Sequence, residues 1–222
     1  MERVLFNEPG EVHTRLKSLG LEEAELVRVV QFGQASRAEC TENHPPSYAG
    51  YTGWAETVRA LREYLIPLKW TRCNDGNWPL AVSPCEKFAI AVATGNEATG
   101  LSSITPSTKA SKGPRTAQAV TVNLQLAFDF GTIAAIKTAI PSDLRKATGR
   151  TTWFLLIHVD RKKSELRCEL ARPVRMSEDG RVDDWAERII LSATPLDPDP
   201  ETSFGTNGPD GPDFTAEIKR RA

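Results

Sequence analysis

The stretch from Trp70 to Gly95 constrains the fold of this chain more than any other. Its turn, Asn74-Asp75-Gly76-Asn77, suits a tight β-hairpin, because Asp and Gly tolerate the positive φ that such a loop requires. The run that follows, Lys87 to Thr94, places large apolar residues on one face and alanines on the other. A strand that is apolar on both faces is typical of a sheet interior, and the alanine face favours a closely packed helix.

Three helical patterns precede this stretch, over Pro9–Leu19, Leu21–Cys40 and Gly53–Ile66. The second has apolar residues at helical spacing and three glutamates in its first turn, where the helix dipole favours negative charge. The segment Thr41–Thr52 contains Pro45-Pro46 and two glycines, which predicts a break between the second and third helices.

Two further strands are predicted downstream. Thr151–Val159 is apolar on both faces, which indicates a central strand. Glu165–Ala171 alternates strictly, with Leu166, Cys168 and Leu170 on the buried face and charged residues on the other, which predicts a one-sided or edge strand. The remaining predictions are a strand over Ala117–Leu124, helix over Gly131–Thr148, and a mixed element over Arg181–Leu191 that begins as helix.

These elements predict an α+β fold with a mixed, mostly antiparallel sheet of about five to six strands, covered by the N-terminal helices. We expect a single domain over residues 1–192, with a helical N-terminal part (1–52) and a sheet core (53–192). Residues 193–222 are rich in Pro, Gly and acidic residues, which predicts a flexible, disordered tail.

The overall charge of the chain gives no reason to expect binding to an anionic partner. The 222 residues carry a net charge of -1, so binding to an anionic partner would need a local basic patch. The longest apolar run, Trp153–Ile157, is too short to span a bilayer. The first residues of the sequence do not show the pattern of a signal peptide. We therefore expect a cytoplasmic protein without membrane contact. The four cysteines form no C-x-x-C pair, which predicts reduced thiols, with Cys168 in the core.

The segment Gly95–Thr116 is dominated by Gly, Ser, Thr and Pro and predicts a long exposed loop, of the kind that is often functional. Lys109, Lys112 and Arg115 outnumber its one acid, Glu97. These three residues are the predicted nucleic-acid or phosphate contacts, although solvated loop cations are the simpler interpretation. The loop has no Walker A motif.

The element order from Gly53 onward, helix, three strands, helix and strand, resembles the core of PD-(D/E)xK nucleases. The resemblance implies a Mg²⁺-dependent phosphodiesterase, in which Asp75 and Glu86 would hold the metal and Lys87 would approach the attacking water. Adjacent strand residues point to opposite faces, so Glu86 and Lys87 fit this motif only if a bulge intervenes.

Other candidate sites are weaker. Cys40 and His44, with Cys73 and Cys85 downstream, have an unusual spacing for zinc. His158 ends a core strand, where a structural histidine is commoner than a catalytic base. Gln125–Phe130 is similar to the glutamine-leucine-aromatic peptides that bind the bacterial sliding clamp, and is a candidate contact for a protein partner. A strand end that packs on the core is the alternative for this segment.

The sequence therefore favours a non-enzymatic binding or accessory protein, which contacts nucleic acid or a protein partner through the Gly95–Thr116 loop. The alternative is a metal-dependent nuclease on a degenerate PD-(D/E)xK-like core. Because no catalytic constellation is complete, no catalytic residue is assigned under the first interpretation. The sequence determines neither a substrate nor an oligomeric state.

Overall fold

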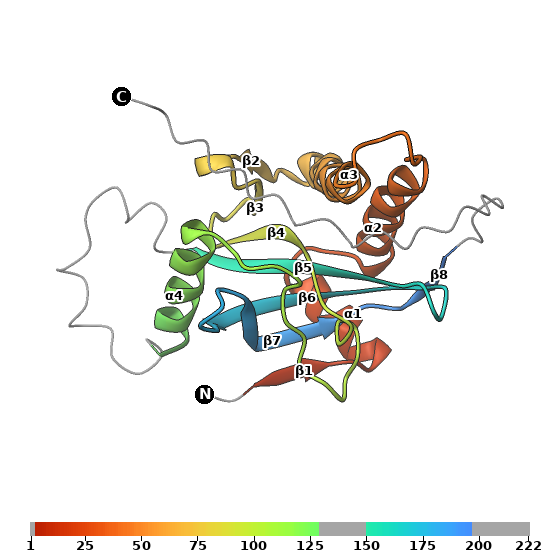
Figure 1. The fold of residues 1–222 in the computed structure, drawn as a ribbon. Coiled ribbons are helices and arrows are strands. Elements are labelled where there is room, and N and C mark those ends of the chain that lie inside the picture. The colour runs from red at the N-terminus through yellow and green to blue at the C-terminus, as the bar shows by residue number, and fades with distance from the viewer. Residues whose placement is uncertain (1–2, 129–149, 197–222) are drawn as a thin grey trace, which may run out of the picture.

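The computed structural model describes residues 3–128 and 150–196, which form one mixed β-sheet with helices on both faces (Figure 1). The strands are β1 (Val4–Phe6), β2 (Thr71–Cys73), β3 (Leu80–Val82), β4 (Phe88–Thr94), β5 (Thr151–Asp160), β6 (Glu165–Met176), β7 (Val182–Ile190) and β8 (Thr194–Pro195). The α-helices are α1 (Pro9–Ser18), α2 (Glu23–Ala38), α3 (Tyr48–Leu65) and α4 (Pro114–Phe128). Two short 3-10 helices, η1 (Ile66–Leu68) and η2 (Asp75–Asn77), flank β2.

The strand order is β1-β7-β6-β5-β4-β3-β2, and β8 pairs with the start of β6. Among the described strands, only the pairs β1–β7 and β4–β5 are parallel. This confirms the predicted α+β fold with a mixed, mostly antiparallel sheet. The sheet has more strands than expected, because β1 and β8 are too short to leave a periodic signal.

Helices α1, α2 and α3 cover one face of the sheet, as predicted. Their core includes Leu26 and Leu65 from the helices and Ile90, Leu155 and Leu170 from the strands. Each of these side chains is at most 1% exposed. Cys168 is in the same core, as expected, and burial raises the pKa of its thiol to about 12.

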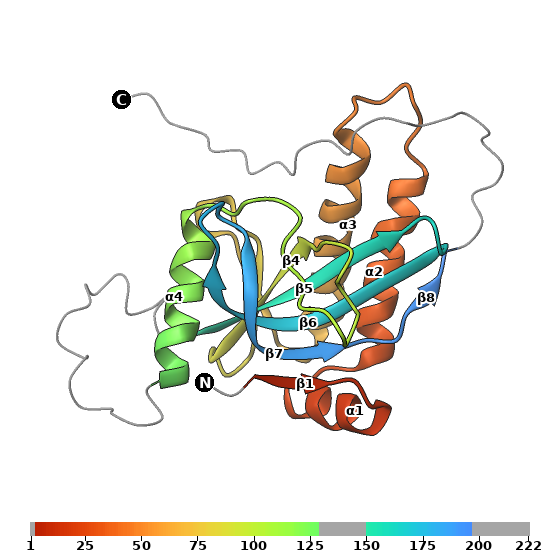
Figure 2. The same cartoon turned by 60° about the horizontal axis from the view of Figure 1, so that its bottom comes forward.

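The opposite face is covered by α4 and by the Gly95–Thr116 loop (Figure 2). Val120 of α4 packs with the alanines of β4 and with Phe154, so the small face of β4 does receive a helix. The buried amide of Asn123 anchors α4 to the sheet. It donates to the carbonyls of Thr152 and Pro173, and its oxygen accepts from the Thr152 amide.

The prediction of a strand over Ala117–Leu124 was wrong, since these residues lie in α4. The buried positions of α4 follow a helical spacing through Thr116, Ala119, Val120 and Asn123. Small and polar residues occupy most of that face, so the Val120–Val122 alternation was the more visible pattern.

The helical start predicted for Arg181–Leu191 was also wrong, because Val182–Ile190 is the strand β7 throughout. β7 buries polar side chains, including Asp184, Glu187 and Arg188, which hides its period-2 pattern. β6 is likewise an interior strand between β5 and β7, and its supposedly exposed residues Arg167 and Glu169 are 4% and 0% exposed.

The remaining predictions are matched only in part. β2 and β3 pair as a hairpin, but η2 lies in the connection, which is therefore longer than a two-residue turn. The third helix starts at Tyr48, inside the predicted break. β8 lies within the predicted tail, whereas residues 197–222 and the predicted helix Gly131–Thr148 lie outside the described residues.

None of the described helices combines the length and the apolar character needed to cross a membrane.

Candidate functional site

The Gly95–Thr116 loop is held against the sheet by a buried ion pair. Arg188 of β7 donates to the carboxylate of Glu169 at 2.7 and 3.0 Å. The same guanidinium donates to the carbonyls of Leu101 and Ile104, and the Gly100 amide donates to Glu169. The loop therefore supplies the hydrogen bonds that this ion pair needs in a buried position.

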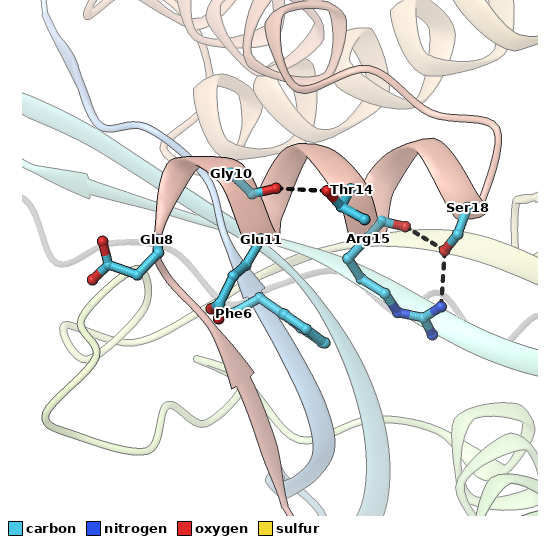
Figure 3. A pocket seen from close by; sticks show the side chains of 7 residues that line it. All are labelled: Phe6, Glu8, Gly10, Glu11, Thr14, Arg15 and Ser18. Carbon is cyan, nitrogen blue, oxygen red and sulfur yellow. Dashed lines mark hydrogen bonds between the residues drawn. The ribbon is translucent and has the colours of Figure 1, made fainter.

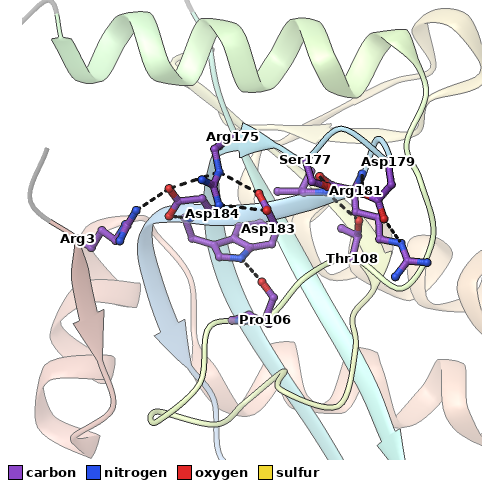
Figure 4. A network of polar contacts seen from close by, with 11 residues as sticks. Arg3, Pro106, Thr108, Arg175, Ser177, Asp179, Arg181, Asp183 and Asp184 are labelled. Carbon is purple, nitrogen blue, oxygen red and sulfur yellow. Dashed lines mark hydrogen bonds and ion pairs between the residues drawn. The ribbon is translucent and has the colours of Figure 1, made fainter.

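A second set of contacts fixes the later part of the loop to the β6–β7 hairpin (Figure 4). The indole of Trp185 donates to the carbonyl of Pro106 at 2.7 Å. Thr108 is fully buried and exchanges hydrogen bonds with the backbone of Val182 through its hydroxyl and its amide. Residues 102–105 of the loop are exposed as predicted, but Pro106 and Thr108 are buried. From Pro114 onward the segment is helix α4.

Between this loop and the helices lies a groove with a volume of about 950 Å³. It surrounds the carboxyl ends of the parallel strands β4 and β5, through Val92–Asn96 and Ile157–Asp160. In sheets with parallel strands, the crevice beyond these ends is a common ligand site. The other walls come from α2, α3 and the β5–β6 turn.

Close packing of α2 against α3 shapes one wall of the groove. A Cβ atom on Gly33 would lie 1.9 Å from the hydroxyl of Thr57, so this position of α2 accepts no side chain. Trp54 of α3 also lines the groove, and its indole donates to the carbonyl of Val92 at the end of β4. Tyr51 lies one turn before Trp54, with ring centroids 5.8 Å apart.

The groove is strongly basic in a chain of net charge -1. Its lining contains seven basic residues and two acidic ones. The basic residues come from four parts of the chain: Arg37, Lys109, Arg161, Lys162, Lys163, Arg167 and Arg181. The acidic residues are Glu97 and Asp160.

The β5–β6 turn presents three consecutive exposed cations, Arg161-Lys162-Lys163. The carboxylate of Asp160 accepts the amides of Lys162 and Lys163 at 3.1 and 3.2 Å, which holds the turn in shape. Burial raises the pKa of Asp160, but these amides and the charge of Arg167 outweigh it and lower the pKa. Asp160 is therefore ionised at neutral pH and is committed to the turn.

Arg167 and His158 form the polar base of the groove. Arg167 donates through Nη2 to the Glu97 carbonyl at 3.0 Å and to Asp160 at 3.3 Å. Its buried Nε and Nη1 atoms have no hydrogen-bond partner among the described residues. Burial, together with the charge of Arg167, lowers the pKa of His158, so the imidazole is neutral at pH 7.

The structure separates the three predicted basic contacts of the loop. Lys109 lines the groove. Lys112 lies by the β6–β7 turn, where its amide donates to Gly180, and Arg115 lies beside Gly76 of η2. Three consecutive cations, Arg161-Lys162-Lys163, also line the groove. Their run is visible in the sequence, but they are not among the predicted contacts.

The residues of the nuclease hypothesis lie on both sides of β3 in the chain. Asp75 lies in η2, before β3, whereas Glu86 lies in the turn after β3 with φ of 55°. Lys87 directly precedes β4. The Asp75 side chain lies outside the described part of the chain. Among the side chains that the structure does describe, no three from His, Cys, Asp or Glu are grouped so as to hold a metal ion.

The proposed clamp-binding segment is helical where it is described. Gln125–Phe128 form the last turn of α4, so neither the extended peptide nor the strand end that we expected is present there. Asp129 and Phe130 lie outside the described residues. A protein partner at this segment stays a prediction.

A second, smaller hollow of about 560 Å³ lies between Phe6 of β1 and one side of α1 (Figure 3). Its only basic residue, Arg15, donates to both carboxylate oxygens of Glu187 and to the hydroxyl of Ser18. With its cation engaged in this way, the hollow is a weaker candidate for an anionic ligand than the groove.

Comparisons of the chain with protein-family models, with curated proteins and with solved structures found no match. A function therefore has to be inferred from the groove itself.

Proposed function

We propose that this protein is a non-enzymatic nucleic-acid-binding protein whose groove holds the phosphate backbone. The observation that carries the proposal is the excess of seven basic over two acidic residues in the groove lining. Lysine and arginine side chains that neutralise phosphates release condensed counterions, which drives binding without sequence specificity.

The placement of the cations favours a polymer over a small phosphate ligand. They come from α2, the Gly95–Thr116 loop, the β5–β6 turn with the start of β6, and the residue before β7, so they belong to several walls of the groove. Trp54 and Tyr51 add aromatic rings beside this track. A basic groove with aromatic side chains is typical of single-strand binding, and we propose single-stranded nucleic acid as the ligand.

Fluorescence anisotropy of labelled single-stranded and double-stranded oligonucleotides tests this proposal. We expect single strands to bind more tightly than duplexes at low salt. The variant R161A/K162A/K163A should lower the affinity about tenfold, because three phosphate contacts are removed.

The matched control is K17A/R28A/R72A, which removes the same charge at exposed positions outside the groove lining. We expect this control to change the affinity less than about twofold. Equal losses in the two variants, or no binding by the native chain at low salt, would contradict the proposal.

The nuclease alternative keeps its support from topology, since α3, β2, β3, β4, α4 and β5 follow the predicted order. We nevertheless propose binding without cleavage, because Asp75 and Glu86 lie on opposite sides of β3 in the chain. Incubation of labelled DNA and RNA with Mg²⁺ or Mn²⁺ should give no cleavage. Cleavage that disappears in Asp75→Ala would overturn this conclusion in favour of the nuclease.

A further inference from the structure

We propose that the acidic segment 197–213 of this chain docks on the basic groove and competes with nucleic acid for it. The inference rests on the proposed function of the groove and adds a mode of regulation to it. Three observations support it: where the segment starts, its charge, and the length of chain available to reach the groove.

The segment starts at the basic rim of the groove. β8 pairs with Leu166 and Glu165 at the beginning of β6, and Figure 2 shows β8 next to the β5–β6 turn. Leu196, the last residue described, donates its amide to the carbonyl of Ser164 at 2.8 Å. Ser164 directly follows Arg161-Lys162-Lys163, so the chain leaves the sheet beside these three cations.

The charge of the segment is opposite to that of the groove. Residues 197–213 contain five acidic residues and no basic one. The acidic residues are Asp197, Asp199, Glu201, Asp210 and Asp213. Carboxylates next to exposed lysine and arginine side chains are attracted by a Coulomb force that salt weakens, as phosphates are.

Because the segment is tethered to β8, weak contacts are sufficient for it to dock on the groove. A chain of 17 residues reaches at most about 60 Å when fully extended, which is enough to follow the groove. A ligand that is tethered this close has an effective concentration in the millimolar range. Nucleic acid must displace the segment before it binds. The segment therefore lowers the apparent affinity of the protein for nucleic acid, but it does not prevent binding.

The test compares two charge-neutralised variants of the full chain in the anisotropy assay. The first, D197N/D199N/E201Q/D210N/D213N, removes the negative charge of the segment with isosteric side chains. The control, E8Q/E11Q/E42Q/E63Q/E178Q, removes the same charge from exposed glutamates outside the groove. We expect the first variant to bind a single strand about five times more tightly at low salt, and the control less than about twice.

An equal gain in both variants would show that only net charge matters and would overturn the proposal, as would no gain in the first. Carbodiimide cross-linking without nucleic acid separates this inference from the proposed function. We expect amide bonds between carboxylates of the segment and Lys162 or Lys163, detected by mass spectrometry.

Absence of these cross-links, or their formation only between isotopically distinct copies of the chain, would overturn intramolecular docking. Cross-links in a protein that binds no nucleic acid would support docking and reject the proposed function instead.

Discussion

One face of the sheet is covered by helices alone, whereas helix α4 shares the other face with the Gly95–Thr116 loop. On the face of α1, α2 and α3, the strands contribute apolar side chains such as Leu155 and Leu170, both fully buried. On the face of the Gly95–Thr116 loop, β6 contributes Glu169, and β7 contributes Arg188 and Trp185. A single strand, β6, thus alternates between an apolar and an ionic core.

The difference follows from what each covering element requires. A helix satisfies its own backbone hydrogen bonds and needs only an apolar surface to pack on. A buried loop carries backbone carbonyl and amide groups that need partners. Arg188 and Trp185 supply donors to Leu101, Ile104 and Pro106, so a few polar side chains fix the loop that forms one wall of the groove.

The largest effect is expected for Glu169→Ala, which tests the ionic face. The substitution leaves Arg188 buried without its carboxylate partner, and loss of one member of a buried pair costs about 3–5 kcal/mol of unfolding free energy. Urea denaturation measures this change. Limited trypsin digestion should also show faster cleavage at Lys109 and Lys112, because the loop loses its anchor. A stability loss below about 1 kcal/mol would show that the ion pair does not hold the loop.

The matching change on the helical face is Leu155→Ala. Removing this fully buried side chain leaves a cavity and should cost about 2–5 kcal/mol in the same urea experiment. Under native conditions, however, trypsin cleavage of the loop should stay close to that of the native chain. Local release of the loop in this variant would contradict the separation of the two faces.

A smaller effect is expected for Thr108→Val, which keeps the shape of the side chain but removes its hydroxyl. The Val182 amide then loses its bond to that hydroxyl, so we expect a loss of about 1–3 kcal/mol. Thr121→Val is the control, since the exposed Thr121 hydroxyl bonds only within α4, and it should change stability by less than about 0.5 kcal/mol. Similar losses in both variants would argue against a specific anchor at Thr108.

The smallest effect concerns pH. In the unfolded chain His158 has a pKa of about 6.5, and burial lowers this pKa in the folded protein. At a pH between the folded and the unfolded pKa, the unfolded chain therefore binds more protons than the folded protein. Stability should therefore fall as the pH drops below about 6.5. Urea midpoints of the native chain and of His158→Gln at about pH 7.5 and 5.5 check this. An identical pH dependence in both chains would remove His158 as its cause.

The same contrast explains what the sequence predicts well. The helices of the apolar face and the strands β4, β5 and β6 follow from long apolar periodicities, which report burial against apolar partners. β7 and α4 were assigned to the wrong class, because they bury residues such as Arg188 and Asn123, whose burial depends on partners far away in the chain. β1 has only three residues and leaves no periodic signal.

The candidate site was predictable in its parts but not as a whole. Lys109 was predicted, and the run Arg161-Lys162-Lys163 was visible as a charge cluster. Their common groove depends on the packing of α2 on α3 and on the ionic anchor of the loop, and neither leaves a local pattern. The basic residues of the groove come from four parts of the chain, so the groove can be recognised only in the tertiary structure.

The central claim is that cations of the groove contact phosphates, and its most direct test is the salt dependence of nucleic-acid binding. The logarithm of the association constant for a single strand is measured against the logarithm of salt concentration, for the native chain and for R161A/K162A/K163A. Each lost phosphate contact should reduce the slope by about 0.7, so the variant should lose up to about 2 units of slope. An unchanged slope would contradict phosphate binding in the groove.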